Sequence, residues 1–168
     1  MSTTYEPIAT TTLGSAQASY TFSSFSGSYT DLILVAFPLG SVNNYDLGIR
    51  FNSDTGNNYS WTSLRFNADD SANPISDRAS NTNYIAMKTN ITDNIPYPSI
   101  IQIQNYSNST TNKTLIARSA RGNYALSTIV GLWRSNSAIT SITISLFGGG
   151  SANLATNTTF SLYGIASA

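Results

Sequence analysis

The acidic side chains between positions 69 and 78 are the residues whose type and spacing come nearest to catalytic chemistry. Asp69 and Asp70 are adjacent, and Asp77 and Arg78 follow in a stretch rich in Asp, Asn and Ser. Two carboxylates placed on either side of a glycosidic bond can hydrolyse it by acid–base catalysis. Adjacent aspartates on a loop have no structural reason to face each other, so this pattern favours a solvated loop over a hydrolase site.

The rest of the sequence contains no convincing motif for metal binding or for nucleophilic catalysis. The segment Asn52–Asn57 is rich in oxygen ligands, but it lacks the full ligand series and the closing glutamate of a calcium-binding loop, so it predicts a turn. The chain has no histidine and no cysteine, which excludes Ser–His and Cys–His nucleophile pairs and thiolate metal sites. The sequence therefore predicts no catalytic, metal-ligating or cofactor-binding residue, and a protein that is not an enzyme and needs no cofactor.

Five residues are instead candidates for contact with a partner. Tyr5 and Pro7 lie in an N-terminal stretch that could be extended, and Tyr97 lies between two prolines in an expected loop. Arg118 and Arg121 are expected on either side of a turn, where they could pair with acidic groups on a neighbour. The other aromatics could stack on sugars, but Trp61 and Trp133 sit inside expected strands, where packing in a core is favoured.

The elements that would position these residues are strands. From Ser141 to Leu146, Ser and Thr alternate strictly with Ile142, Ile144 and Leu146. Alternation of this kind indicates a strand with one buried face and one wet face. The glycine-rich segment that follows predicts a turn, and Thr158–Ile165 is the expected partner strand.

Similar runs recur roughly every 8–15 residues with no helical period between them, which favours an antiparallel sandwich over alternating strand–helix units. We expect an all-β, jelly-roll-like sandwich of two antiparallel sheets and about ten strands. It forms a single domain over residues 1–168, with residues 1–13 as a strand or an extended N-terminal arm in which Pro7 suits an edge. The expected strands are Tyr5–Leu13, Ser19–Phe25, Asp31–Phe37, Tyr45–Phe51, Tyr59–Phe66, Tyr84–Lys88, Ser99–Tyr106, Thr114–Arg118, Asn123–Arg134, Ile139–Phe147 and Thr158–Ile165. The segments Ala68–Asn83 and Thr89–Pro98 are expected to be loops.

The small number of charged residues and their balance restrict the kinds of partner that the protein is expected to bind. Only 10% of the residues are charged, and the formal net charge is zero. A nucleic-acid binder or a protein of an anionic membrane surface needs a basic patch, so neither partner is expected. No apolar run is long enough to span a bilayer, and the N-terminal stretch lacks the basic and apolar regions of a secretory signal.

Six stretches of the sequence resemble segments of virion proteins of tailed bacteriophages, of cyanophages and marine phages in particular. They are Tyr5–Leu13, Asn58–Ser60, Ile103–Ser107, Gly131–Arg134, Ala138–Ile142 and Tyr163–Ile165. The resemblance implies a jelly-roll-like sandwich on the surface of the particle, usually assembled as a homotrimer. Its motifs are structural, and it supplies no binding site that could be carried over residue by residue.

The resemblance leaves two roles open. The first is a decoration (cement) protein, made in the host cytoplasm, that binds the assembled major capsid protein or other virion proteins on the head. The absence of a coiled-coil stem or fibrous N-terminal region favours it, with residues 1–13 as one candidate tether. The second is a tail-fibre or tail-tip module that contacts host surface glycans through Tyr97, Asn73 or Asn83. A depolymerase is disfavoured, because the chain offers no convincing carboxylate pair.

Overall fold

Strands dominate this chain because its β-branched and aromatic residues alternate with Ser, Thr and Asn, and few helix formers interrupt them. A computed structural model describes residues 4–42, 45–67, 73–92, 95–122, 125–147 and 152–165. Within these ranges it contains twelve strands and no helix, and hence no helix that could cross a membrane. The predicted all-β class is confirmed.

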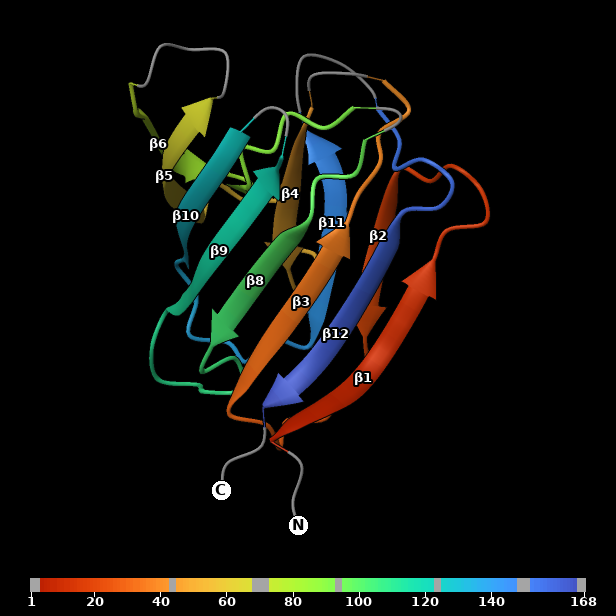
Figure 1. The fold of residues 1–168 in the computed structure, drawn as a ribbon. Helices are drawn as coiled ribbons and strands as arrows, with labels where there is room; N and C mark the ends of the chain where they lie inside the picture. Colours follow the sequence, from red (N-terminus) through yellow and green to blue (C-terminus); the bar gives the residue numbers. More distant parts are fainter. Residues whose placement is uncertain are drawn as a thin grey trace.

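The strands form two antiparallel sheets that lie one behind the other (Figure 1). The long sheet has eight strands, in the spatial order β1 Tyr5–Thr12, β12 Thr159–Ile165, β3 Asp31–Phe37, β8 Ser99–Gln104, β9 Lys113–Arg121, β10 Ala125–Trp133, β5 Tyr59–Asn67 and β6 Ile75–Thr82. The short sheet has four strands, in the order β2 Ser19–Ser23, β11 Ser141–Phe147, β4 Asp46–Phe51 and β7 Ile85–Ala86.

The connectivity is that of a jelly roll with an extension. Without β5, β6, β9 and β10, the sheets read β1-β12-β3-β8 and β2-β11-β4-β7. The chain then passes from one sheet to the other at every step except from β4 to β7, which pair within the short sheet. The hairpins β5–β6 and β9–β10 both add to the same edge of the long sheet. They therefore create a broad surface that the eight-stranded core of the fold would lack.

The core lies between the sheets and is built from the predicted inward positions. In β11, Ile142, Ile144 and Leu146 are buried as expected, and Trp61 and Trp133 are buried too. Trp133 packs against the rings of Phe51 and Tyr59, which come from different sheets. The predicted core role of the two tryptophans is confirmed.

Of the two alternatives for the N-terminal stretch, the structure has the strand, because residues 5–12 form β1, which pairs with β12 along its length. Two other expectations about the elements are wrong. The strand β11 pairs with β2 and β4, whereas the predicted partner Thr158–Ile165 contributes β12 to the other sheet. Part of the predicted loop Ala68–Asn83 is the edge strand β6, whose polar side chains suit a strand that is exposed on one side.

Candidate functional site

The outer face of the long sheet, where the two added hairpins lie beside β8, is the most unusual surface of the protein. Side chains along β5, β8, β9 and β10 alternate between buried and exposed, as expected of strands with one face in the core. In an antiparallel sheet the outward positions of such strands are normally polar. Here many of them are apolar.

Six large apolar side chains on these four strands are between 42 and 53% exposed. They are Leu64, Phe66, Ile100, Ile116, Leu126 and Val130, and we call the surface that they form the apolar face. They make up six of the ten exposed large hydrophobic residues in the described part of the chain. Their concentration on one face distinguishes them from the scattered apolar residues that any protein surface carries.

Strand register brings these residues together from distant parts of the sequence. Leu126 on β10 lies opposite Phe66 on β5, and Val130 lies opposite Ile116 on β9. Opposite residues of antiparallel strands have their Cβ atoms about 5 Å apart, so these pairs are in contact range. The apolar face is therefore continuous across β5, β10 and β9, with Ile100 on β8 extending it.

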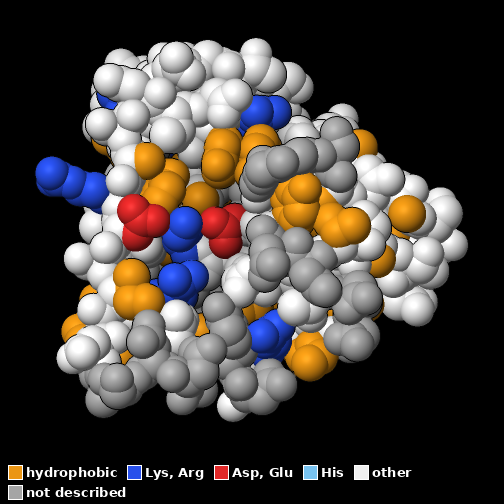
Figure 2. Space-filling view, turned by 90° about the horizontal axis from the view of Figure 1, so that it is seen from above, with side chains coloured by type: hydrophobic (Ala, Val, Ile, Leu, Met, Phe, Trp, Pro, Cys, Tyr) orange, Lys and Arg blue, Asp and Glu red, His pale blue; other side chains and the backbone are white. Residues whose placement is uncertain are grey.

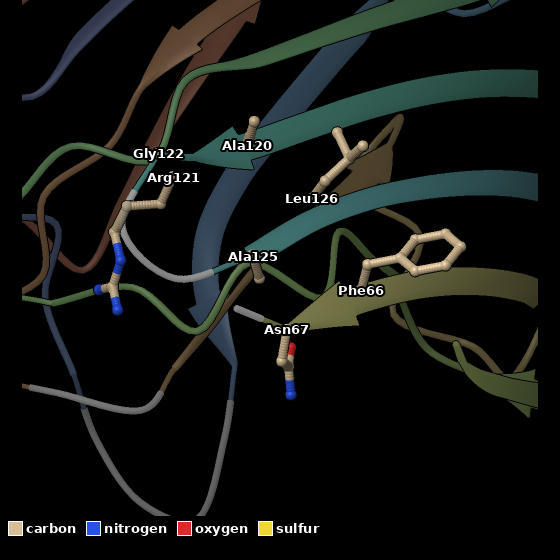
Figure 3. A pocket seen from close by; sticks show the side chains of 7 residues that line it. All are labelled: Phe66, Asn67, Ala120, Arg121, Gly122, Ala125 and Leu126. Carbon is tan, nitrogen blue, oxygen red and sulfur yellow. The ribbon is translucent and has the colours of Figure 1, made fainter. Parts of the chain in front are cut away.

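Two shallow depressions indent this region at the end where β9 turns into β10. One, of about 400 Å³, is lined by Phe66, Ala120 and Leu126 among others, and a second, of about 300 Å³, by Pro98, Ile100 and Leu126 among others. Figure 3 shows the side chains of Phe66, Ala120 and Leu126 on one side of the sheet and those of Asn67, Arg121 and Ala125 on the other. The depressions make the face uneven, and protruding side chains of another protein could fit into them.

Arg118 is the predicted contact residue that the structure places in this face. It is exposed near the middle of β9 and is not beside a turn, as the sequence suggested, because β9 continues to Arg121. Arg118 lines the smaller depression. Among the described residues it forms no ion pair with a carboxylate.

Two further predicted contacts, Tyr5 and Pro7, lie at the opposite edge of the same sheet. Tyr5 is 59% exposed, and Pro7 is exposed beside a β-bulge in β1. Proline cannot donate a ladder hydrogen bond, so an edge strand with a bulge is where it is tolerated. The prediction that Pro7 suits an edge is confirmed, and both side chains remain accessible.

Tyr97 and Arg121 do not fit their predicted role. Tyr97 is completely buried, and its hydroxyl donates a hydrogen bond to the carbonyl of Ala125 at 3.3 Å. Its position between two prolines suggested an exposed loop, but the ring fills the core, which the local sequence does not reveal. Arg121 is half-buried and points away from the apolar face, with Nη1 donating to Oγ1 of Thr92.

Charged side chains gather at one end of the sandwich, where Figure 2 shows acidic and basic groups side by side. Lys88 Nζ lies 3.2 Å from a carboxylate oxygen of Asp46 and 3.2 Å from one of Asp77, and 5.2 Å from the ring centroid of Trp61. Burial lowers the pKa of Lys88, but the two carboxylates outweigh this and leave the pKa raised. Asp77 is therefore one of three charged groups in an ion-pair network.

The other predicted chemical groups give no catalytic arrangement in the described residues. Asp69 and Asp70 lie outside the described ranges. No group of three or more Asp or Glu residues within those ranges could hold a metal ion. The candidate glycan contact Asn73 is exposed, and Asn83 is half-buried, with its carbonyl accepting a hydrogen bond from Arg50 Nε.

Sequence reasoning missed the apolar face, although one signal was present. In Ile100-Ile101, Leu115-Ile116 and Ile129-Val130, apolar residues occupy consecutive positions, so at these points each strand has an apolar side chain on both of its faces. Such runs are typical of strands covered on both sides. In the structure, no described part of the chain covers the outer apolar side chains of β8, β9 and β10.

No protein-family model matches the chain, and none of the curated proteins matches it either. The relation to phage virion proteins therefore stays a prediction from the sequence.

Proposed function

We propose that this chain is a non-enzymatic structural protein of a tailed phage, and that it decorates the assembled capsid. The observation that supports this most directly is the apolar face, with six large apolar side chains exposed on four neighbouring strands. Contiguous exposed apolar surface of this kind marks sites of association. A face of this breadth suits a flat protein surface better than a small ligand.

Attachment through the face is favoured over attachment through a sheet edge. An edge strand recruits another chain by pairing its free backbone groups, and proline, bulges and short length prevent this. The edge strand β1 carries Pro7 and a bulge, and in the short sheet β2 and β7 are only five and two residues long. The edge strand β6 is as long as β1 and has no proline, but it carries the charged residues Asp77 and Arg78.

The proposed mechanism is the burial of the apolar face on assembled subunits. Each exposed apolar side chain contributes about 25 cal/mol per Å² of surface removed from water, so a single face supports a modest affinity. A homotrimer, as the resemblance implies, would present three such faces, and simultaneous contact would multiply the apparent affinity. Preference for assembled capsids over free subunits follows from this arrangement.

Localisation tests the proposal first. Cryo-electron microscopy of the phage that encodes this chain should show density for the sandwich at symmetry-related positions across the head, with the apolar face against the shell. Density confined to the tail would overturn the decoration role and favour the receptor-binding alternative. Absence from the particle would contradict both roles.

A mutational test addresses the face itself. Ile116→Thr and Val130→Thr keep β-branched side chains in outward strand positions, so the fold should persist while apolar contact is lost. We expect the double variant to bind purified heads at least about 10-fold more weakly in co-sedimentation, which corresponds to about 1.4 kcal/mol. Thr21→Val, at an exposed position of the short sheet, is the control and should bind like the parent. Unchanged binding by the double variant would show that another surface makes the contact.

A further inference from the structure

Arg118 stands almost alone as a charge within the apolar face. On β9 its outward neighbours are Ile116 and Ala120, and the residue opposite it on β8 is Ile100. On β10 the residue opposite is Thr128, with Leu126 and Val130 at the adjacent outward positions. A partner that covers the apolar side chains must therefore cover the guanidinium as well.

Covering a guanidinium without an acceptor is unfavourable. A buried charge that loses water and gains no partner costs several kcal/mol, far more than one apolar side chain contributes. A carboxylate compensates best for the burial of an arginine, because it accepts two parallel hydrogen bonds from the N–H groups of the guanidinium. The partner surface is thus expected to place a carboxylate opposite Arg118.

The described outer face of the long sheet carries no carboxylate that could pair with Arg118 of a second copy. The outward positions of β5, β6, β8, β9 and β10 include two arginines, Arg78 and Arg118, and no Asp or Glu within the described residues. If two copies met face to face about a two-fold axis, the contact would enclose two copies of Arg118, with Arg78 of each copy at its margin, and no carboxylate from the described residues of either face. Like charges brought together in this way disfavour the pairing.

The dimensions match the surface of a protein partner. Four strands at a spacing of about 4.8 Å, over about 20 Å of strand length, give a face of roughly 400 Å². This is about half of the 800 Å² that each partner contributes to an interface of standard size. A contact of this area is weak by itself, which is consistent with attachment at several points.

We propose that the apolar face docks on a protein surface that is itself apolar and carries a carboxylate opposite Arg118, and that this surface belongs to a different chain and not to a second copy. The inference rests on the proposed function and specifies the chemistry of its partner. Arg118 acts as the specificity residue, because an apolar surface without a carboxylate would be rejected by the buried charge. Arg78, on the edge strand β6, lies at the margin of the contact and contributes less.

The test uses the full chain and purified heads of the encoding phage in co-sedimentation. Arg118→Gln should weaken binding about 10-fold. Arg118→Glu should weaken it about 100-fold, because the new carboxylate would face the carboxylate of the partner and the two negative charges would repel each other. Arg118→Lys should fall between the parent and Arg118→Gln, since lysine keeps the charge but loses the bidentate geometry. Arg78→Gln is the matched control and should change binding less than threefold.

Neutralising the other side of the contact gives an independent readout. Heads whose surface carboxylates have been converted to amides with carbodiimide and glycinamide should bind the parent chain as weakly as untreated heads bind Arg118→Gln. Arg118→Gln should bind treated heads almost as tightly as it binds untreated heads. Circular dichroism and thermal unfolding of each variant establish that the fold is intact.

The outcomes separate the two proposals. If the parent chain does not bind heads, the proposed function fails and this inference fails with it. If the parent binds and Ile116→Thr/Val130→Thr weakens it, but neither Arg118→Glu nor amidation does, attachment stands and the carboxylate partner is wrong. If sedimentation velocity shows that copies associate through this face, with loss of association in the Thr double variant, the requirement for a different chain is overturned.

Discussion

At the scale of single residues, Tyr59 shows how one polar atom is accommodated inside the core. Its ring is completely buried and stacks on Trp133 at a centroid distance of 6.3 Å. Its hydroxyl accepts a hydrogen bond from the amide of Phe51 at 3.1 Å and lies 3.1 Å from the carbonyl of Asp54, to which it can donate. Burial raises the pKa of Tyr59 to about 12. The neutral phenol therefore holds the end of β4 against the start of β5.

The raised pKa predicts a loss of stability at alkaline pH. In the unfolded chain Tyr59 should ionise near its ordinary pKa of about 10. Its contribution is therefore complete below pH 10 and is lost as the pH rises from 10 towards 12, because the unfolded state releases the proton first.

We expect Tyr59→Phe to lower the free energy of unfolding at pH 7 by about 1–3 kcal/mol, because the amide of Phe51 loses its buried acceptor. The variant should also lose less stability than the parent between pH 9 and 11. Urea unfolding across this range measures both effects, and Tyr5→Phe, at an exposed position, is the control. Equal alkaline losses in the parent and in Tyr59→Phe would contradict the assignment.

At the scale of elements, the contact between β10 and β7 depends on a glycine. A Cβ atom at Gly131 would lie 2.7 and 2.8 Å from side-chain carbons of Ile85 and 3.0 Å from one of Leu115. Both neighbours are buried, so they have little room to move. The absence of a side chain at Gly131 lets the short strand β7 pack directly on β10.

Gly131→Ala should therefore destabilise the protein by about 1–3 kcal/mol through overpacking. Gly27→Ala is the control, because no atom lies within 4 Å of a Cβ there, and it should change stability by less than about 1 kcal/mol. Combining Gly131→Ala with Ile85→Val should recover part of the loss if Ile85 is the obstruction. If urea unfolding shows that the effects of the two substitutions simply add, the overpacking at Gly131 involves a residue other than Ile85.

At the scale of the whole molecule, Lys88 joins the two sheets at the charged end. Asp46 belongs to β4 of the short sheet and Asp77 to β6 of the long sheet, and the ammonium bridges them. About a fifth of the side chains of Lys88 and Asp46 is exposed, and about half of that of Asp77. Partial exposure weakens each pair, so the network is expected to contribute modestly.

Lys88→Met keeps most of the apolar stem of the side chain but removes Nζ, which lies over the Trp61 ring, and so leaves both carboxylates without their shared cation. We expect a loss of about 1 kcal/mol at low ionic strength, and a smaller loss in 1 M NaCl, where the charges are screened. Thermal unfolding of the parent and the variant at both salt concentrations measures this. A difference that does not depend on salt would indicate lost packing in place of lost charge interaction.

Much of the architecture is encoded locally. Alternation in β11 was enough to predict that Ile142, Ile144 and Leu146 face the core, because a strand places every second side chain on the same face. Trp61 and Trp133, which were expected in the core because they lie inside predicted strands, are buried too. Spacing of the strands and the lack of helical periods were enough to predict a two-sheet sandwich.

Only the tertiary structure decided which strands are neighbours and which apolar residues stay exposed. Alternation specifies the face of a strand but not its partner, so β11 was paired with β12 when its neighbours are β2 and β4. Tyr97 lies between two prolines of an expected loop and Leu126 lies in an expected strand, yet Tyr97 is buried and Leu126 is 53% exposed. Burial depends on what packs above a side chain, and that depends on contacts between residues far apart in the chain. For the same reason, Arg118 became recognisable as the charge within an apolar surface only when β5, β8, β9 and β10 were placed side by side.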